Sequence, residues 1–143
     1  MSPERQIVNN EITAEEKKAL IQKAVDARSR AYAPYSKYKV GAALLTSTGK
    51  VYEGANVENA AYPVTMCAER VAVFKAVSEG DKKFEAIAVV TANGGAPCGS
   101  CRQVLAEFGL DIVVLVADSK GNLVSQSTVA DLLPGAFTGA DLA

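Results

Sequence analysis

Two short, continuous apolar segments limit the folds open to this chain more than any other feature of its sequence. Residues 84–91 and 111–117 each have the length of a strand, and apolar side chains fill consecutive positions in them instead of alternate ones. Strands of this kind are covered on both faces, as in the central sheet of an α/β protein. The sequence therefore predicts an α/β domain with helices on both faces of a sheet.

The other predicted elements fit around these two strands. Thr13 and Glu16 have the spacing of a capping box, which begins an apolar-striped helix that Pro34 stops. The further segments that we expect are strands over 40–45 and 51–55, helices over 66–79 and 99–108, a strand over 123–125 and a short helix over 128–133. At 143 residues we expect one domain, 1–143, with residues 1–12 and 138–143 loosely ordered.

Composition excludes several classes of function. The chain has no histidine, so a Ser-His-Asp triad, a Cys-His dyad and an HExxH zinc site are all impossible. The net charge is −1 and no basic run exceeds two residues, which argues against a nucleic-acid partner. No apolar segment is long enough to cross a bilayer, and residues 1–5 do not resemble a signal peptide. We therefore expect a cytoplasmic protein without nucleic-acid or membrane partners.

The three cysteines all lie where helices are expected to begin. Cys67 opens the second predicted helix, and Cys98 and Cys101 open the third. A helix N-terminus lowers the pKa of a thiol through its free N–H groups and partial positive charge. Cys98 and Cys101 are three residues apart, so their sulfurs point the same way, and Cys67 can supply a third sulfur. Three thiolates suit Zn²⁺ with an open fourth position, as catalytic sites require.

Glu69 is the candidate general acid and base, because no histidine is available for that work. On a regular helix it would lie nearly opposite Cys67, two residues earlier. We therefore expect Cys67 to occupy the non-helical cap position, so that Glu69 lies beside the metal without binding it.

Other interpretations of the same residues stay open at this point. Cys98 and Cys101 alone have the spacing of a thioredoxin-like redox pair. A closed structural zinc site with Glu69 as fourth ligand is also possible, and iron is compatible with the same ligands. Asn56 and Glu58 alone would be ordinary turn residues on a solvated loop.

Taken in order, the motifs resemble one enzyme family. Cys67-Ala68-Glu69, followed by Pro97-Cys98-Gly99-Ser100-Cys101, resembles the signature by which zinc nucleoside deaminases are generally known, in its three-cysteine form. The chain is similar to the short, homotetrameric cytidine deaminases within the cytidine and deoxycytidylate deaminase family. Between residues 13 and 137 this similarity extends over segments 35–44, 56–60, 62–63, 67–70, 101–103 and 132–134.

The resemblance implies a fold, a cofactor and a reaction. The fold is a three-layer α/β/α sandwich with a five-stranded mixed sheet, assembled as a homotetramer with shared active sites. One Zn²⁺ per subunit, held by Cys67, Cys98 and Cys101, would lower the pKa of a bound water. Glu69 would carry protons to N3 of the base and to the departing amine. The reaction is hydrolysis of cytidine and deoxycytidine to uridine and deoxyuridine with release of ammonia, a step of pyrimidine salvage.

The resemblance also implies substrate contacts. Asn56 and Glu58 match the ribose-binding pair, and a carboxylate there favours a neutral nucleoside over a nucleotide. Tyr38 stands where the family usually has a Phe packed against the base. The main chain of Ala68 should read the amide edge of cytosine. Tyr62 and Phe137 resemble residues that family members lend to a neighbouring subunit's pocket.

Charge gives Arg70 a predicted role beside the metal. Three thiolates leave a zinc site net negative, and Arg70 could reduce that charge by donating to the sulfurs.

Two other hypotheses for the function stay open beside the cytidine deaminase. One is a zinc deaminase acting on a different nucleobase substrate or on nucleic acid, and the other is a non-catalytic module in which zinc only stabilises the fold.

Overall fold

The strands form a five-stranded mixed sheet in a computed structural model that describes residues 12–142. The strand order is β2-β1-β3-β4-β5. Within this sheet β3 and β4 pair in parallel, and the other neighbouring strands are antiparallel. The strands are β1 (Gly41–Thr46), β2 (Val51–Ala55), β3 (Phe84–Thr91), β4 (Val113–Asp118) and β5 (Leu123–Thr128). The mixed sheet implied by the family resemblance is therefore confirmed.

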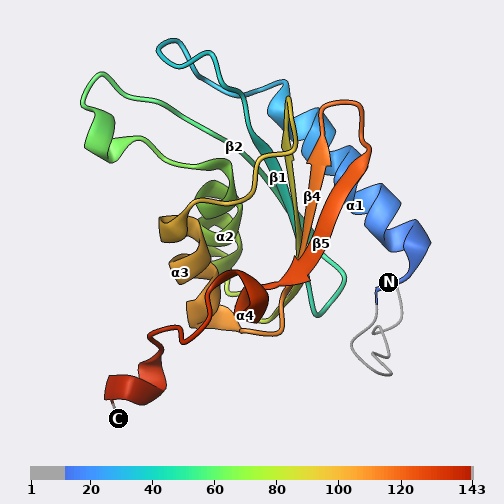
Figure 1. Cartoon of the computed structure of the whole chain (residues 1–143), viewed down its shortest axis with the longest axis vertical. Helices are drawn as coiled ribbons and strands as arrows, with labels where there is room; N and C mark the ends of the chain where they lie inside the picture. Colours follow the sequence, from blue (N-terminus) through green and yellow to red (C-terminus); the bar gives the residue numbers. More distant parts are fainter. Residues whose placement is uncertain (1–11, 143) are drawn as a thin grey trace.

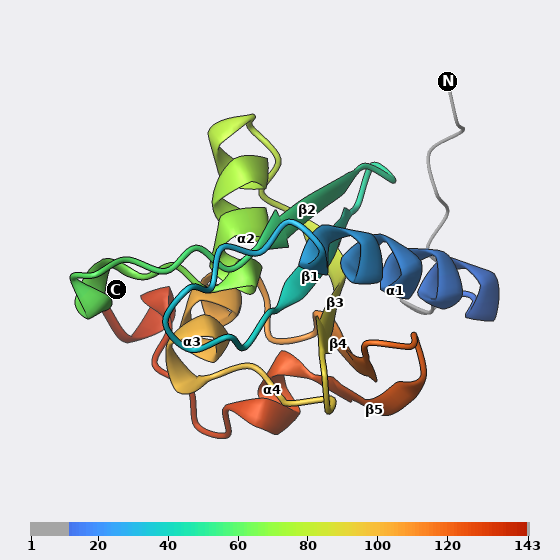
Figure 2. The same ribbon diagram turned by 90° about the horizontal axis from the view of Figure 1, so that it is seen from above.

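Helices cover both faces of this sheet, which confirms the three-layer arrangement (Figures 1 and 2). One face carries α1 (Ala14–Arg28), and the other carries α2 (Ala68–Ser78) and α3 (Gly99–Phe108). The short helix α4 (Val129–Leu132) follows β5 directly. Among the helices described over residues 12–142, none has the length and apolar character needed to span a membrane.

The central strand β3 contributes side chains to a separate apolar core on each face. Ala86 and Ala88 point toward α1, whereas Ile87 and Val89 point toward α2 and α3. All four side chains are at most 1% exposed. This double coverage is what the continuous apolar run of the sequence predicted, and the small alanines let α1 lie close to the sheet.

Backbone contact fixes the position of α2 on the sheet. A Cβ at Gly54 of β2 would lie 2.4 Å from the carbonyl oxygen of Ala68 and 2.7 Å from the amide nitrogen of Ala72. No side chain fits into that space, so α2 lies directly against the strand. The N-terminal turn of α2, which carries the candidate catalytic residues, is therefore positioned by main-chain packing.

Several predicted boundaries were wrong. The second helix begins at Ala68 and not at residue 66, because Met66 pairs with Val57 as an isolated antiparallel bridge. The last strand continues to Thr128 instead of ending at 125, since its polar residues form an exposed edge strand. Residues 139–142, expected to be loose, form a 3₁₀ helix, and Ile12 is buried. The rest of the predicted loose ends, 1–11 and 143, lies outside the described residues.

Candidate active site

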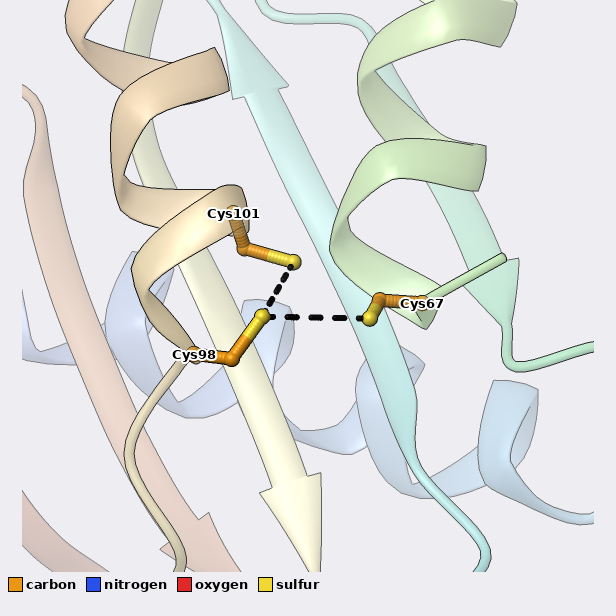
Figure 3. A group of neighbouring side chains, drawn as sticks. All are labelled: Cys67, Cys98 and Cys101. Carbon is orange, nitrogen blue, oxygen red and sulfur yellow. Dashed lines mark hydrogen bonds between the residues drawn. The ribbon is translucent and has the colours of Figure 1, made fainter. Parts of the chain in front are cut away.

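Three cysteine sulfurs meet between the N-termini of α2 and α3 (Figure 3). The Cys67 and Cys98 sulfurs are 4.0 Å apart, and the Cys98 and Cys101 sulfurs are 3.6 Å apart. All three sulfurs lie within 4.8 Å of one another, and the cysteines form no disulfide. The structure thus brings together the three thiols that the sequence placed at two helix entrances.

The local backbone explains why these sulfurs are free to face one another. Cys67 and Cys98 are the N-cap residues of α2 and α3, and both have extended backbone angles. Neither side chain makes the capping hydrogen bond to its own helix. Cys101 is in the first turn of α3 and is fully buried. The helix N-termini therefore direct their partial positive charge at the sulfur cluster.

The cluster favours thiolate at Cys67. The neighbouring Cys101 thiol has the largest effect in lowering the pKa of Cys67 to about 5, against an opposing effect of burial. The guanidinium of Arg70 donates a 3.3 Å hydrogen bond from Nη2 to the Cys67 sulfur and lowers this pKa further. Within the described residues, the buried Nε of Arg70 has no hydrogen-bond partner. Arg70 therefore places a positive charge beside the sulfur cluster.

The donor set fits a zinc ion. Three sulfurs on two rigid helices can occupy three corners of a tetrahedron, because thiolate is a ligand that Zn²⁺ prefers. The side chain of Cys98 is exposed toward the pocket described below, whereas that of Cys101 is buried. The fourth position would therefore face the pocket, as a catalytic zinc site requires.

Glu69 lies next to this cluster at the start of α2. It is only 4% exposed, and this burial raises the pKa of its carboxyl above the usual value. Because Cys67 occupies the extended cap position, Glu69 can line the same pocket although it lies only two residues later. The sequence predicted that Cys67 would occupy the non-helical cap position, and the structure confirms it. A buried carboxyl with a raised pKa is suited to accept and return a proton.

A cavity of about 330 Å³ opens beside the cluster and is large enough for a nucleoside-sized ligand. Its walls come from the segment before β1, the segment between β2 and α2, and the end of β3 with the loop that follows. The lining residues are Ser36, Tyr38, Val40, Asn56, Glu58, Tyr62, Thr65, Cys67, Ala68, Glu69, Val89, Thr91, Gly95, Ala96 and Cys98. Most of the predicted site residues therefore share one cavity.

Asn56 and Glu58 are both buried, and their side chains already hold the pocket wall. Asn56 donates from Nδ2 to the Tyr38 carbonyl at 2.9 Å and accepts from the Val40 amide at 2.9 Å. Glu58 accepts from the Ser36 hydroxyl and from the amide groups of Tyr35 and Ser36. These donors hold the pKa of Glu58 below its usual value. The two side chains thus fix the segment before β1 in place.

The remaining predicted substrate contacts lie at different places. Tyr38 lines the cavity with a side chain that is 41% exposed. Ala68 is buried in the cavity wall, and the exposed Tyr62 lies at the same cavity of its own chain. The side chain of Phe137 is exposed and does not line the cavity, and its carbonyl accepts a hydrogen bond from Gln103.

Sequence reasoning missed two residues that support the site. Ser36 donates to Glu58 and lines the cavity. Arg102 donates from Nε to the Pro97 carbonyl and from Nη1 to the Leu132 carbonyl, both at 2.8 Å. Arg102 thus ties the residue before Cys98 to the end of α4. Its only signal in the sequence was its place inside a family motif, next to Cys101.

Comparison with known proteins gives concordant results. The family model for the cytidine and deoxycytidylate deaminase zinc-binding region matches residues 14–117. The cytidine deaminase of Sporosarcina psychrophila is 52% identical over 126 residues, covering 86% of this chain and 92% of that protein. The cytidine deaminase of Halalkalibacterium halodurans is 50% identical over 130 residues, covering 89% and 98%. The crystal structure of cytidine deaminase from Burkholderia pseudomallei superposes with a TM-score of 0.80 at 48% identity, covering 88% of this chain and all of that one.

Proposed function

This chain belongs to the cytidine and deoxycytidylate deaminase family, and on that premise we propose that it hydrolyses cytidine and deoxycytidine to uridine and deoxyuridine. In this reaction water adds its oxygen to C4 of the base, the C4–N4 bond breaks and ammonia leaves. The observation that carries the proposal is the meeting of three cysteine sulfurs and the buried Glu69 carboxyl at one cavity.

The zinc ion that this family region binds would be held by Cys67, Cys98 and Cys101, and it supplies the activated water that hydrolysis needs. Glu69 takes a proton from the attacking water, delivers it to N3 of the base and returns a proton to the departing N4 amine. Its burial and raised pKa support this role, because such a carboxyl exchanges protons closer to neutral pH than an exposed one does.

The cavity wall supports a neutral nucleoside as substrate. Glu58 is anionic, with a lowered pKa, and its carboxylate could accept from the sugar hydroxyls while repelling a phosphate. The buried Asn56 would contact the sugar from the same segment, and the Ala68 main chain would read the amide edge of the base. Tyr38 and Tyr62 would pack against the ligand from the cavity rim.

A homotetramer with shared active sites is the assembly that we propose. Phe137 supports it, because this exposed aromatic side chain lies outside its own cavity and is available to a neighbouring one. Phe74 supports it too, since it is 45% exposed beside Phe108 in a shallow groove on the outer side of α2 and α3.

The three cysteines, which form no disulfide, support a reducing compartment such as the cytoplasm.

A substrate panel tests the proposed reaction. We expect the purified protein to change the ultraviolet absorbance of cytidine and deoxycytidine, with little change for adenosine or for cytidine 5′-monophosphate. Turnover of adenosine alone would favour a deaminase for a different nucleobase. A zinc-loaded protein without turnover of any of these substrates would favour the non-catalytic module and would contradict the proposal.

Arg70→Ala tests how the charge of the metal centre is balanced. Three thiolates and one Zn²⁺ carry a net charge of −1, and Arg70 donates to the Cys67 sulfur. We expect the variant to retain zinc while kcat falls by about 10- to 100-fold, the range typical for groups that hydrogen-bond to metal ligands. Steady-state assays with metal analysis check this. Arg70→Lys, which keeps the charge, should recover part of the loss, and full activity of zinc-loaded Arg70→Ala would contradict the role.

A further inference from the structure

A hydrogen bond joins two separate walls of the cavity. The Tyr38 hydroxyl, from the segment before β1, donates to Oδ1 of Asn93 at 2.8 Å. Asn93 belongs to the loop between β3 and α3, which ends at Cys98. The tip of a cavity-lining aromatic ring is therefore tied to the loop that carries a metal-ligating thiol.

The same asparagine oxygen is tied to the central strand. Thr91, the last residue of β3, is 3% exposed, and its hydroxyl donates to Asn93 Oδ1 at 3.3 Å. That hydroxyl also accepts a 2.7 Å hydrogen bond from the Gly95 amide. The loop is thus held on one side by the sheet and on the other by Tyr38.

The backbone of Tyr38 is held as firmly as its ring. Its amide donates to the Ser36 hydroxyl at 3.0 Å, and its carbonyl accepts from Asn56 at 2.9 Å. With the main chain fixed at one end and the hydroxyl at the other, the ring has one orientation in the cavity wall. A phenylalanine at this position would keep the ring and lose the outer anchor.

Gly95 lies next to the Tyr38 hydroxyl. A Cβ at position 95 would lie 2.8 Å from the Tyr38 hydroxyl oxygen, too close for two non-bonded atoms. The backbone of Gly95 is not in the left-handed region, so an alanine would not strain the main chain. Among the neighbours of position 95, the Tyr38 hydroxyl is therefore the atom that a methyl group would displace.

We propose that Tyr38 is a positioning residue whose hydroxyl, through Asn93, sets the spacing between the substrate wall and the Cys98 loop. This inference rests on the proposed function. It predicts that loss of the Tyr38–Asn93 hydrogen bond weakens substrate binding. It also predicts that the effect of a side chain at position 95 depends on the Tyr38 hydroxyl.

The first test compares Tyr38→Phe, Asn93→Ala and the double variant, with cytidine as substrate. Each single variant should raise KM by about three- to tenfold while kcat and zinc content stay near wild type, because each removes the Tyr38–Asn93 hydrogen bond. The double variant should be no worse than Asn93→Ala alone, because Tyr38→Phe removes nothing that Asn93→Ala has not already removed. Calorimetric titration with uridine should show the same loss of affinity. Tyr35→Phe is the matched control, since the exposed Tyr35 side chain does not line the cavity.

The second test uses Gly95→Ala in both backgrounds. Gly95→Ala should lower the melting temperature and raise KM in the wild-type background, and both effects should shrink when Tyr38→Phe is also present. Equal effects of Gly95→Ala in the two backgrounds, additive losses in the first test, or an unchanged KM in Tyr38→Phe would each overturn the inference. If the wild type turns over no cytosine nucleoside, the proposed function fails, while the melting temperatures still decide whether Tyr38 and Gly95 are coupled.

Discussion

Glu69→Gln is expected to lower kcat for cytidine by about 10²- to 10⁴-fold, the contribution typical of a general acid–base. Glutamine keeps the size of the buried side chain, but it cannot accept and return a proton. Zinc content and overall stability should change little, because Glu69 is not one of the three clustered sulfur donors. Steady-state kinetics, with zinc measured on the same protein samples, checks the expectation.

The matched control for this variant is Glu15→Gln, which makes the same chemical change at an exposed position in the first turn of α1. It should leave kcat and KM at their wild-type values. If Glu69→Gln kept more than about a tenth of wild-type kcat, the proton-transfer role of Glu69 would be wrong.

Cys101→Ser should produce the second large effect, a loss of bound zinc together with activity. A serine hydroxyl is a poor zinc ligand, and at this fully buried position it replaces the sulfur that completes the cluster. We expect zinc to fall from about one equivalent per chain to a small fraction of that, with kcat falling in proportion. The melting temperature should fall too, because a metal that binds only the folded chain stabilises it.

Two controls separate metal loss from a packing defect. Ser100→Ala changes the neighbouring exposed position of α3 and should retain both zinc and activity. Prolonged dialysis of the wild type against a chelator should reproduce the low melting temperature of Cys101→Ser, and added zinc should restore only the wild type. A Cys101→Ser protein with a full equivalent of zinc would show that Cys101 is not a ligand.

The sequence predicted best those elements whose signals are local. The bounds of β3 and α3 agree with the structure, because an apolar run and a glycine at each helix end mark them clearly. The strand β5 was predicted too short because its exposed polar residues lack a strand pattern, and pairing with β4 alone defines it. Propensity carries little information where tertiary pairing decides the structure.

The site divides in the same way. The cysteines could be found from residue type and spacing, since the chain has three of them, and Glu69 could be found from its place two residues after Cys67. The contacts made by Ser36 and Asn93 could not, because both residues are common in loops and act on partners 22 and 55 positions away. The backbone hydrogen bonds of Arg102 were hidden for the same reason, as any residue offers a carbonyl acceptor.

The three cysteines lie at helix N-termini and outside the two apolar clusters of the fold. The two apolar clusters on either side of the sheet contain none of the three cysteines, so most of the core consists of residues that do not bind metal. Cys67 and Cys98 are 31 residues apart in the sequence, and β3 lies between them. The two sulfurs come together when β3 takes its place in the sheet. Metal would therefore bind at a site that the sheet and the two helix N-termini already hold in place.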